Sequence, residues 1–263
     1  MANNSSFRGL VGIPNFFTLL NLVFGCLAIV FILQTGETIV LLQQEGFTEV
    51  NLPEKITWGC FFIFLAAAVD FLDGFIARIF KSTSNMGRQL DSLADLVSFG
   101  VAPGLILYQL LRISYAQQEN GLDVSIISLF PVFLIPCAAA WRLAKFNLDR
   151  EQQVSFKGVP APAIGLLVAS FPLIIHYQTF NLQFLFINKW LLYSIILLLS
   201  YLMVSNLPLM SMKVKDLNIK NNRARYILFI LGIIAAISLK WLAVPVIFIL
   251  YLILSLAFKN KTS

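Results

Sequence analysis

Long apolar runs recur along the whole of this sequence and leave few folds open to it. Each run is long enough, or nearly long enough, to cross the ~30 Å hydrocarbon core of a bilayer as a helix. Hydrophobic residues make up 59% of the chain and charged residues 12%, against about 45–50% and about 25% in soluble domains. The sequence therefore predicts an all-α fold, a polytopic transmembrane bundle of about eight spans: Phe16–Leu33, Thr57–Phe80, Gly87–Leu111, Val124–Arg142, Val159–Tyr177, Trp190–Met210, Tyr226–Leu239 and Trp241–Phe258.

The last two runs allow two arrangements. Tyr226–Leu239 is short for a span, and Lys240 with Trp241 predicts a tight turn at a membrane interface. The two runs could cross the membrane separately, or enter and leave it as one re-entrant hairpin. We expect residues 1–215 to form one membrane domain, followed at 216–263 by a basic loop and these two additional runs.

The positions of Lys and Arg in the connections indicate how the bundle is oriented. Of the 19 such residues, fifteen lie on the side that holds both termini and the second, fourth and sixth connections, and four lie opposite. Cytoplasmic connections carry an excess of Lys and Arg, so we expect both termini on the cytoplasmic side of the inner membrane. This topology also accounts for the net charge of +6, and we expect no nucleic-acid partner.

Four aspartates interrupt the apolar pattern between residues 70 and 95. Asp70 and Asp73 lie in the second run and Asp91 and Asp95 in the third, with the polar sequence KSTSNMGRQ between them. Spacings of three and four residues put each pair on one face of its helix, so two antiparallel helices would direct four carboxylates into one gap. Such an oxygen-rich site suits a hard divalent cation, Mg²⁺ or Mn²⁺.

Two simpler explanations for these acids fit less well. Solvation at a loop margin is disfavoured because Asp70 lies some ten residues inside its run, about 15 Å at the helical rise. Ion pairing with Arg78 and Arg88 would leave four acids with too few cations. Ionisable groups within membrane spans are in general functional, so we expect a functional site here.

Small residues among the acids favour an enzyme over a cation transporter. Gly74 and Ala77 share a face with Asp70 and Asp73 and leave room for a flat or bulky ligand, which a transporter does not explain. A carboxylate site near the mouth of a bundle suits phosphoryl or phosphatidyl transfer, in which two cations clamp a pyrophosphate. Asp95, at the end of its row, is the best candidate for the base that takes the proton from an attacking hydroxyl.

The complete pattern, D-x-x-D-G-x-x-A-R-x₈-G-x₃-D-x₃-D, resembles the signature of the CDP-alcohol phosphotransferases. The resemblance implies a six-helix core, commonly a homodimer, that moves a phosphatidyl or related group from a CDP-linked donor to an alcohol and releases CMP. It also implies that Asp95 is the base, and that two divalent cations, Mg²⁺ or Mn²⁺, are held by Asp70, Asp73, Asp91 and Asp95.

The same resemblance implies a binding site for the donor, CDP-diacylglycerol, in the lipid bilayer. Gly74, Arg78 and Ser84 are the contacts that it implies, and we expect Ala77 and Gly87 to line the same site. Two polar residues at the mouth of the first run, Asn15 and Thr18, are expected to touch the nucleotide. Helix capping is an equally good explanation for Asn15.

Segments outside the signature bear on the acceptor. IPNFFTLLNLVFGCLAI, RLAKFNLD, FKGVPAPA and YLMVSNLP resemble the branch of the family that uses L-serine, which implies transfer from CDP-diacylglycerol to the serine hydroxyl. Arg142 and Lys157 are candidate serine contacts, since cations on this side could hold a carboxylate, and Asn147 could offer its amide to the acceptor. Positive-inside bias explains these cations equally well, and glycerol 3-phosphate or an inositol phosphate remains the alternative acceptor.

Overall fold

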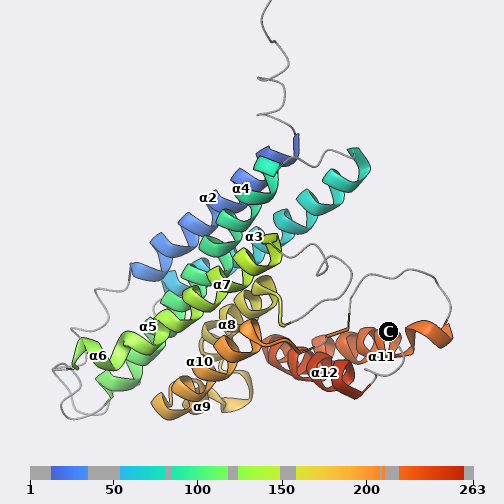
Figure 1. Cartoon of the computed structure of the whole chain (residues 1–263). Helices are drawn as coiled ribbons and strands as arrows, with labels where there is room; N and C mark the ends of the chain where they lie inside the picture. The colour runs from blue at the N-terminus through green and yellow to red at the C-terminus, as the bar shows by residue number, and fades with distance from the viewer. Residues whose placement is uncertain are drawn as a thin grey trace, which may run out of the picture.

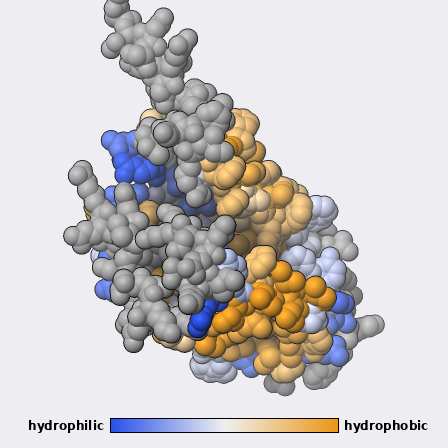
Figure 2. Space-filling view, turned by 90° about the vertical axis from the view of Figure 1, so that its right-hand side faces the viewer, coloured by the Kyte–Doolittle hydropathy of each residue, from blue (hydrophilic) through white to orange (hydrophobic). Residues whose placement is uncertain are grey.

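The computed structural model describes residues 13–34, 54–80, 85–117, 124–148, 158–207, 209–210 and 219–257. Over these residues the backbone forms helices and no strand, and the helices are arranged as a bundle (Figure 1). Five stretches are long and apolar enough to cross a membrane, and Figure 2 shows a broad apolar surface on the face that it displays. The predicted all-α, multi-pass membrane fold is therefore confirmed.

The first three apolar runs each form one long helical segment. α2 (Ile13–Leu33) is followed by α3 (Glu54–Phe80), and α4 (Asn85–Leu96) continues through the π-helical turn η2 (Val97–Val101) into α5 (Ala102–Ala116). α2 packs against α3, α4, η2 and α5. This central position of α2 brings the helices that carry the aspartates around it.

The next three runs complete a core of six long segments in the described part of the chain. α6 (Ile126–Leu129), the 3₁₀ turn η3 (Phe130–Phe133) and α7 (Leu134–Leu148) form one segment. α8 (Ala161–His176) follows Pro160, whose backbone is extended. The short elements η5 (Thr179–Asn181) and α9 (Gln183–Phe186) then lead into α10 (Lys189–Val204).

The sixth run ends as a helix earlier than predicted. We expected it to continue to Met210, but α10 stops at Val204 and Ser205 has extended backbone angles. Pro208 explains the early end, because a proline lacks the amide proton of a helix interior and disfavours helical geometry at the residue before it. Residues 205–207 and 209–210, called the strap below, are therefore free to line a site.

The last two runs form a helical hairpin. α11 (Ile219–Leu239) and α12 (Ala243–Ala257) are joined by η6 (Lys240–Leu242), and Lys240 has a φ of +50°. α11 packs along α12, while α12 and η6 also contact α8. The predicted turn at Lys240 and Trp241 is confirmed; the number of membrane crossings that the hairpin makes stays a prediction.

Candidate active site

Three of the four aspartates bring their carboxylates together. Asp70 from α3 and Asp91 and Asp95 from α4 each offer one oxygen, and these oxygens all lie within 4.8 Å of one another. Asp91 and Asp95 are one helical turn apart and so share a face of α4. The gap that the spacing predicts between the two aspartate-bearing helices is therefore present.

The fourth aspartate, Asp73, is buried and is hydrogen-bonded to a residue of α2. Thr18 Oγ1 on α2 donates a hydrogen bond to Asp73 Oδ2. Asp73 is close enough for its charge to act on both Asp70 and Asp91. The structure thus places all four aspartates in one neighbourhood, with three in mutual reach and the fourth fixed by Thr18.

A row of polar side chains on α2 faces this cluster. Asn15, Thr18 and Asn21, spaced three residues apart, are only 8%, 3% and 0% exposed. Asn21 Nδ2 donates to Asp95 Oδ1 over 3.1 Å, while Asn21 Oδ1 has no hydrogen-bond partner among the described residues. α2 therefore holds Asp73 through Thr18 and Asp95 through Asn21.

A glycine lets α2 come this close to the helix that carries Asp95. A Cβ at Gly25 would lie 2.3 Å from Ser98 Oγ and 3.0 Å from Ser98 Cα. Ser98 belongs to the π-helical turn η2, and its hydroxyl donates to the carbonyl oxygen of Asn21 over 3.1 Å. π-Helical turns often occur at functional positions, and this one aligns Asn21 with Asp95.

The cluster could hold a divalent metal. Carboxylates this close repel one another, and a set of oxygen ligands in a partly buried site is what hard divalent cations prefer. The ion-pair explanation receives no support from Arg88, whose guanidinium donates to Asn85 Oδ1. The side chain of Arg78 lies outside the described residues.

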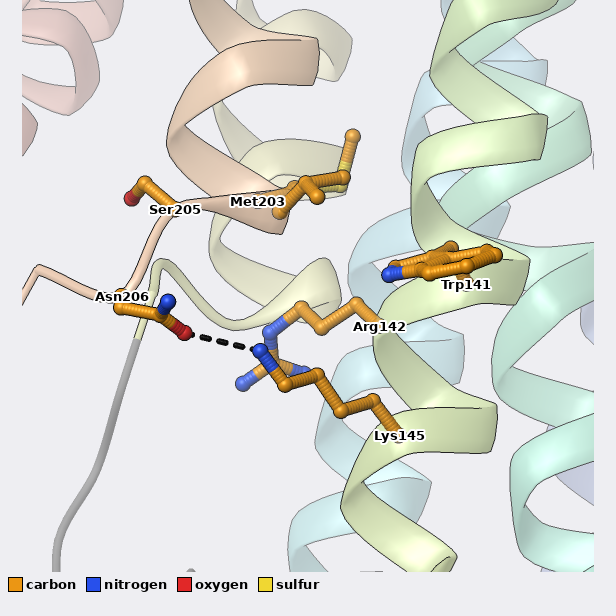
Figure 3. Close-up of a pocket in the computed structure, with 7 residues that line it drawn as sticks. Trp141, Arg142, Lys145, Met203, Ser205 and Asn206 are labelled. Atoms are coloured by element: carbon orange, nitrogen blue, oxygen red, sulfur yellow. Dashed lines mark hydrogen bonds between the residues drawn. The ribbon is translucent and has the colours of Figure 1, made fainter.

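A pocket lies between α7 and the end of α10 (Figure 3). α7 contributes Trp141, Arg142 and Lys145, and Lys145 Nζ donates to Asn206 Oδ1 across the pocket over 2.8 Å. Two cations around one small pocket suit an anionic group such as a carboxylate. The opposite wall is formed by Met203, Val204, Ser205 and Asn206.

Arg142 connects this pocket with the aspartate cluster. Its side chain lines the pocket, and its positive charge acts on Asp95. Its Nε is buried and has no hydrogen-bond partner within the described part of the chain. A buried donor left unpaired costs about 1–3 kcal/mol, so a ligand that accepts from this atom would be stabilised.

Three segments singled out in the sequence meet around the pocket. RLAKFNLD supplies the two cations of α7, and YLMVSNLP supplies the end of α10 and the start of the strap. The described part of FKGVPAPA, from Gly158 onward, packs behind them, because Gly158 N donates to Leu207 O over 2.9 Å and Val159 N donates to Leu202 O over 3.1 Å. YLMVSNLP lies far from the other two segments in the sequence, and the fold brings its described residues to the same place.

The remaining predicted residues are less closely tied to the cluster or the pocket. Gly74 on α3 is exposed and Gly87 on α4 is half-buried. Asn147 does not line the pocket; its Nδ2 donates to Ser92 Oγ over 2.8 Å, which ties α7 to α4 beside Asp91. Four further predictions fall outside the described residues: the side chains of Ala77 and Arg78, and Ser84 and Lys157 as a whole.

The sequence alone does not single out Asn21 or Asn206. Asn21 carries a signal, because it extends by three residues the spacing of the polar pair Asn15 and Thr18 in an apolar run. Asn206 carries none, because its place in the pocket follows from where α10 ends.

Known proteins resemble this chain over most of its length. The family model described as CDP-alcohol phosphatidyltransferase matches residues 11–202. A Helicobacter pylori protein named CDP-diacylglycerol–serine O-phosphatidyltransferase is 36% identical over 171 residues, which are 63% of this chain and 66% of that protein. Proteins of the same name from Bacillus subtilis and Saccharomyces cerevisiae are 35% identical over 149 residues (52% of this chain, 76% of the relative) and 40% identical over 131 residues (46% and 44%). The matched part of the chain thus spans just under two thirds of the Helicobacter pylori relative's length.

Proposed function

The chain belongs to the CDP-alcohol phosphatidyltransferase family, and on that premise we propose that it transfers the phosphatidyl group of CDP-diacylglycerol to the hydroxyl of L-serine, giving phosphatidylserine and CMP. The observation that carries this proposal is the position of Arg142, which lines a cationic pocket while its charge acts on Asp95. An acceptor whose carboxylate binds at Arg142 is thereby held beside the aspartates.

Serine fits the pocket better than a phosphorylated alcohol does. A phosphate monoester carries about −1.5 to −2 charges at neutral pH, whereas the carboxylate of serine carries one. The described lining of the pocket offers two cations, Arg142 and Lys145, and Lys145 already donates to Asn206. The serine-specific names of the relatives support the same choice.

We assign the donor and its cations to the aspartate side of the site. When bound, two Mg²⁺ or Mn²⁺ ions would neutralise the donor's pyrophosphate oxygens and the charge that develops on CMP. Thr18 donates to Asp73, so Thr18 also orients a cation ligand. The proposed cation ligands are Asp70, Asp73, Asp91 and Asp95, and the proposed donor contacts are Asn15, Thr18, Gly74, Ala77, Arg78, Ser84 and Gly87.

Asp95 is the proposed base. It is 8% exposed and accepts a hydrogen bond from Asn21, which fixes the direction of its carboxylate. As the serine oxygen bonds to phosphorus, its proton passes to Asp95 and the bond between phosphorus and the CMP oxygen breaks, with the electron pair leaving on CMP. Arg142 holds the serine carboxylate, with Asn147 and Lys157 as further proposed contacts.

We place the site at the cytoplasmic face of the inner membrane. Arg142, Lys145 and the aspartates gather where the connections carry fifteen of the 19 Lys and Arg residues, the side that is cytoplasmic by the positive-inside rule. Soluble serine and CMP would then exchange with the cytoplasm while the diacylglycerol stays in the bilayer. A homodimer, and a functional division near residue 215, belong to the same proposal.

The test supplies the purified protein with CDP-diacylglycerol, a divalent cation and one labelled acceptor at a time. We expect labelled phosphatidylserine from serine, and no lipid product from glycerol 3-phosphate or inositol phosphate. Arg142→Gln should raise the KM for serine about tenfold or more, as expected when a charged hydrogen bond is lost. The matched control is Arg112→Gln, a cation outside the pocket that donates to Gln109. Product from a phosphorylated acceptor with none from serine would contradict the proposal.

A further inference from the structure

The C-terminal hairpin lies beyond residues 11–202, which the family model matches, yet it is docked along the bundle. Trp241, in the turn, packs against Phe64 of α3 with ring centroids 5.8 Å apart and stacks on Tyr177 at 6.3 Å. Further along, Phe248 and Tyr251 of α12 pack on the main core of the protein. η6 and α12 therefore both contact the bundle, next to α8 (Figure 1).

The hairpin also encloses the end of the strap. Met210 is 6% exposed and forms a second buried cluster with Ala224 and Leu228 of α11. Tyr251 belongs to both clusters, and its hydroxyl donates to the carbonyl oxygen of Met210 over 3.1 Å. A residue outside the matched region thus fixes the backbone of the segment that continues from the pocket wall.

The strap has two attachments, and both follow the pocket wall in the chain. Near its start, Gly158 N donates to Leu207 O, and at its end Tyr251 holds Met210. Leu209, the described residue between these two points, is not part of a helix. Asn206, which pairs with Lys145, lies one residue before the first attachment.

Tyr251 also lies near enough to Arg142 for the two groups to interact electrostatically. It is partly buried, and a buried tyrosine hydroxyl usually holds a polar partner in place. Tyr251 therefore holds the strap through its hydroxyl and interacts electrostatically with the arginine of the pocket.

We propose that Tyr251 is a positioning residue for the acceptor, which holds the strap and the Arg142 side chain in the arrangement that binds the acceptor carboxylate. The identity of that acceptor as serine rests on the proposed function above. α12 therefore helps to shape the acceptor pocket, although it lies outside the residues that the family model matches.

Tyr251→Phe removes the hydroxyl and keeps the ring, so the packing of α12 is retained. We expect the KM for serine to rise about fivefold or more, while kcat and the KM for CDP-diacylglycerol stay within about twofold, the pattern of lost acceptor binding. The matched control is Tyr201→Phe, on the outer face of α10 with 68% of its side chain exposed, which should leave all three constants unchanged.

Hydrogen exchange supplies a second readout that needs no turnover. In Tyr251→Phe the amide of Ser205, and those of Gly158 and Val159 that bond to α10 and the strap, should exchange about fivefold faster. Amides in the middle of α8 should exchange at the wild-type rate.

Unchanged KM for serine together with unchanged exchange would overturn the inference. A parallel fall in kcat and in both affinities, with faster exchange throughout the bundle, would also overturn it by assigning Tyr251 a general structural role. If the wild-type protein uses another acceptor, the proposed function fails, and the KM for that acceptor and the exchange rates still decide the role of Tyr251.

Discussion

Gly158→Ala tests whether the pocket wall depends on close packing against the FKGVPAPA segment. Gly158 has a φ of +75°, where a residue with a side chain costs about 1–2 kcal/mol. A Cβ there would lie 2.7 Å from the carbonyl oxygen of Met203 and 2.8 Å from that of Ser205. Both are backbone atoms, so they cannot rotate away as the end of a flexible side chain could.

The wall must therefore move, at the cost of a further 1–3 kcal/mol or so for an overpacked site. We expect the free energy of unfolding to fall by about 2–5 kcal/mol in total. Because Met203 and Ser205 line the pocket, the KM for serine should also rise more than the KM for CDP-diacylglycerol.

The assay compares the apparent unfolding temperature and both KM values of the wild-type protein and the variant in the same detergent. Gly232→Ala is the matched control, because a Cβ there would meet its nearest neighbour, Ile247, at 3.8 Å, an ordinary contact. Wild-type stability and a wild-type KM for serine in Gly158→Ala would show that the pocket wall does not depend on this close packing. An equal rise of both KM values would show that the strap does not act on the acceptor alone.

Three further predictions concern the aspartate cluster. Asp95→Asn should keep donor binding yet lower kcat by about 10²–10⁴, the usual contribution of a general base; wild-type turnover would remove Asp95 from that role. Asn21→Leu should lower kcat at least about tenfold with little change in either KM, since a hydrogen bond to a charged group is worth about 1.5–3 kcal/mol; a change confined to the KM for CDP-diacylglycerol would make Asn21 a donor contact instead. A chelator such as EDTA should abolish turnover and Mg²⁺ or Mn²⁺ should restore it, whereas full activity after exhaustive chelation would contradict a metal site at Asp70, Asp91 and Asp95.

The helices could be predicted from the sequence because a membrane imposes their length. Every predicted apolar run falls largely on one helix or on consecutive helical elements of the structure, since about 20 apolar residues are needed to span the bilayer. The end of α10 was harder to predict from the sequence. The apolar residues Leu207 and Leu209 continue the run, although Pro208 disfavours a helix there. Hydropathy alone does not distinguish an apolar helix from an apolar strap.

The aspartate cluster could also be predicted from the sequence, because its residues are close in sequence and their spacing follows the helical repeat. Asp91 and Asp95 share a face of α4 by spacing alone. The pocket could not be predicted in this way, because Lys145 and Asn206 are 61 residues apart. They meet through the packing of α7 against α10, and such packing depends on where small residues let helices approach. Tyr251 carries no sequence signal at all, since one tyrosine in an apolar helix is ordinary.

The proposed transfer to serine is tested most directly by measuring CMP and labelled lipid in one sample of the purified protein, with CDP-diacylglycerol, a divalent cation and labelled L-serine. We predict one CMP released for each phosphatidylserine formed, with both products lost together in Asp95→Asn. Release of CMP without incorporation of serine, or labelled lipid formed at the wild-type rate by Asp95→Asn, would contradict it.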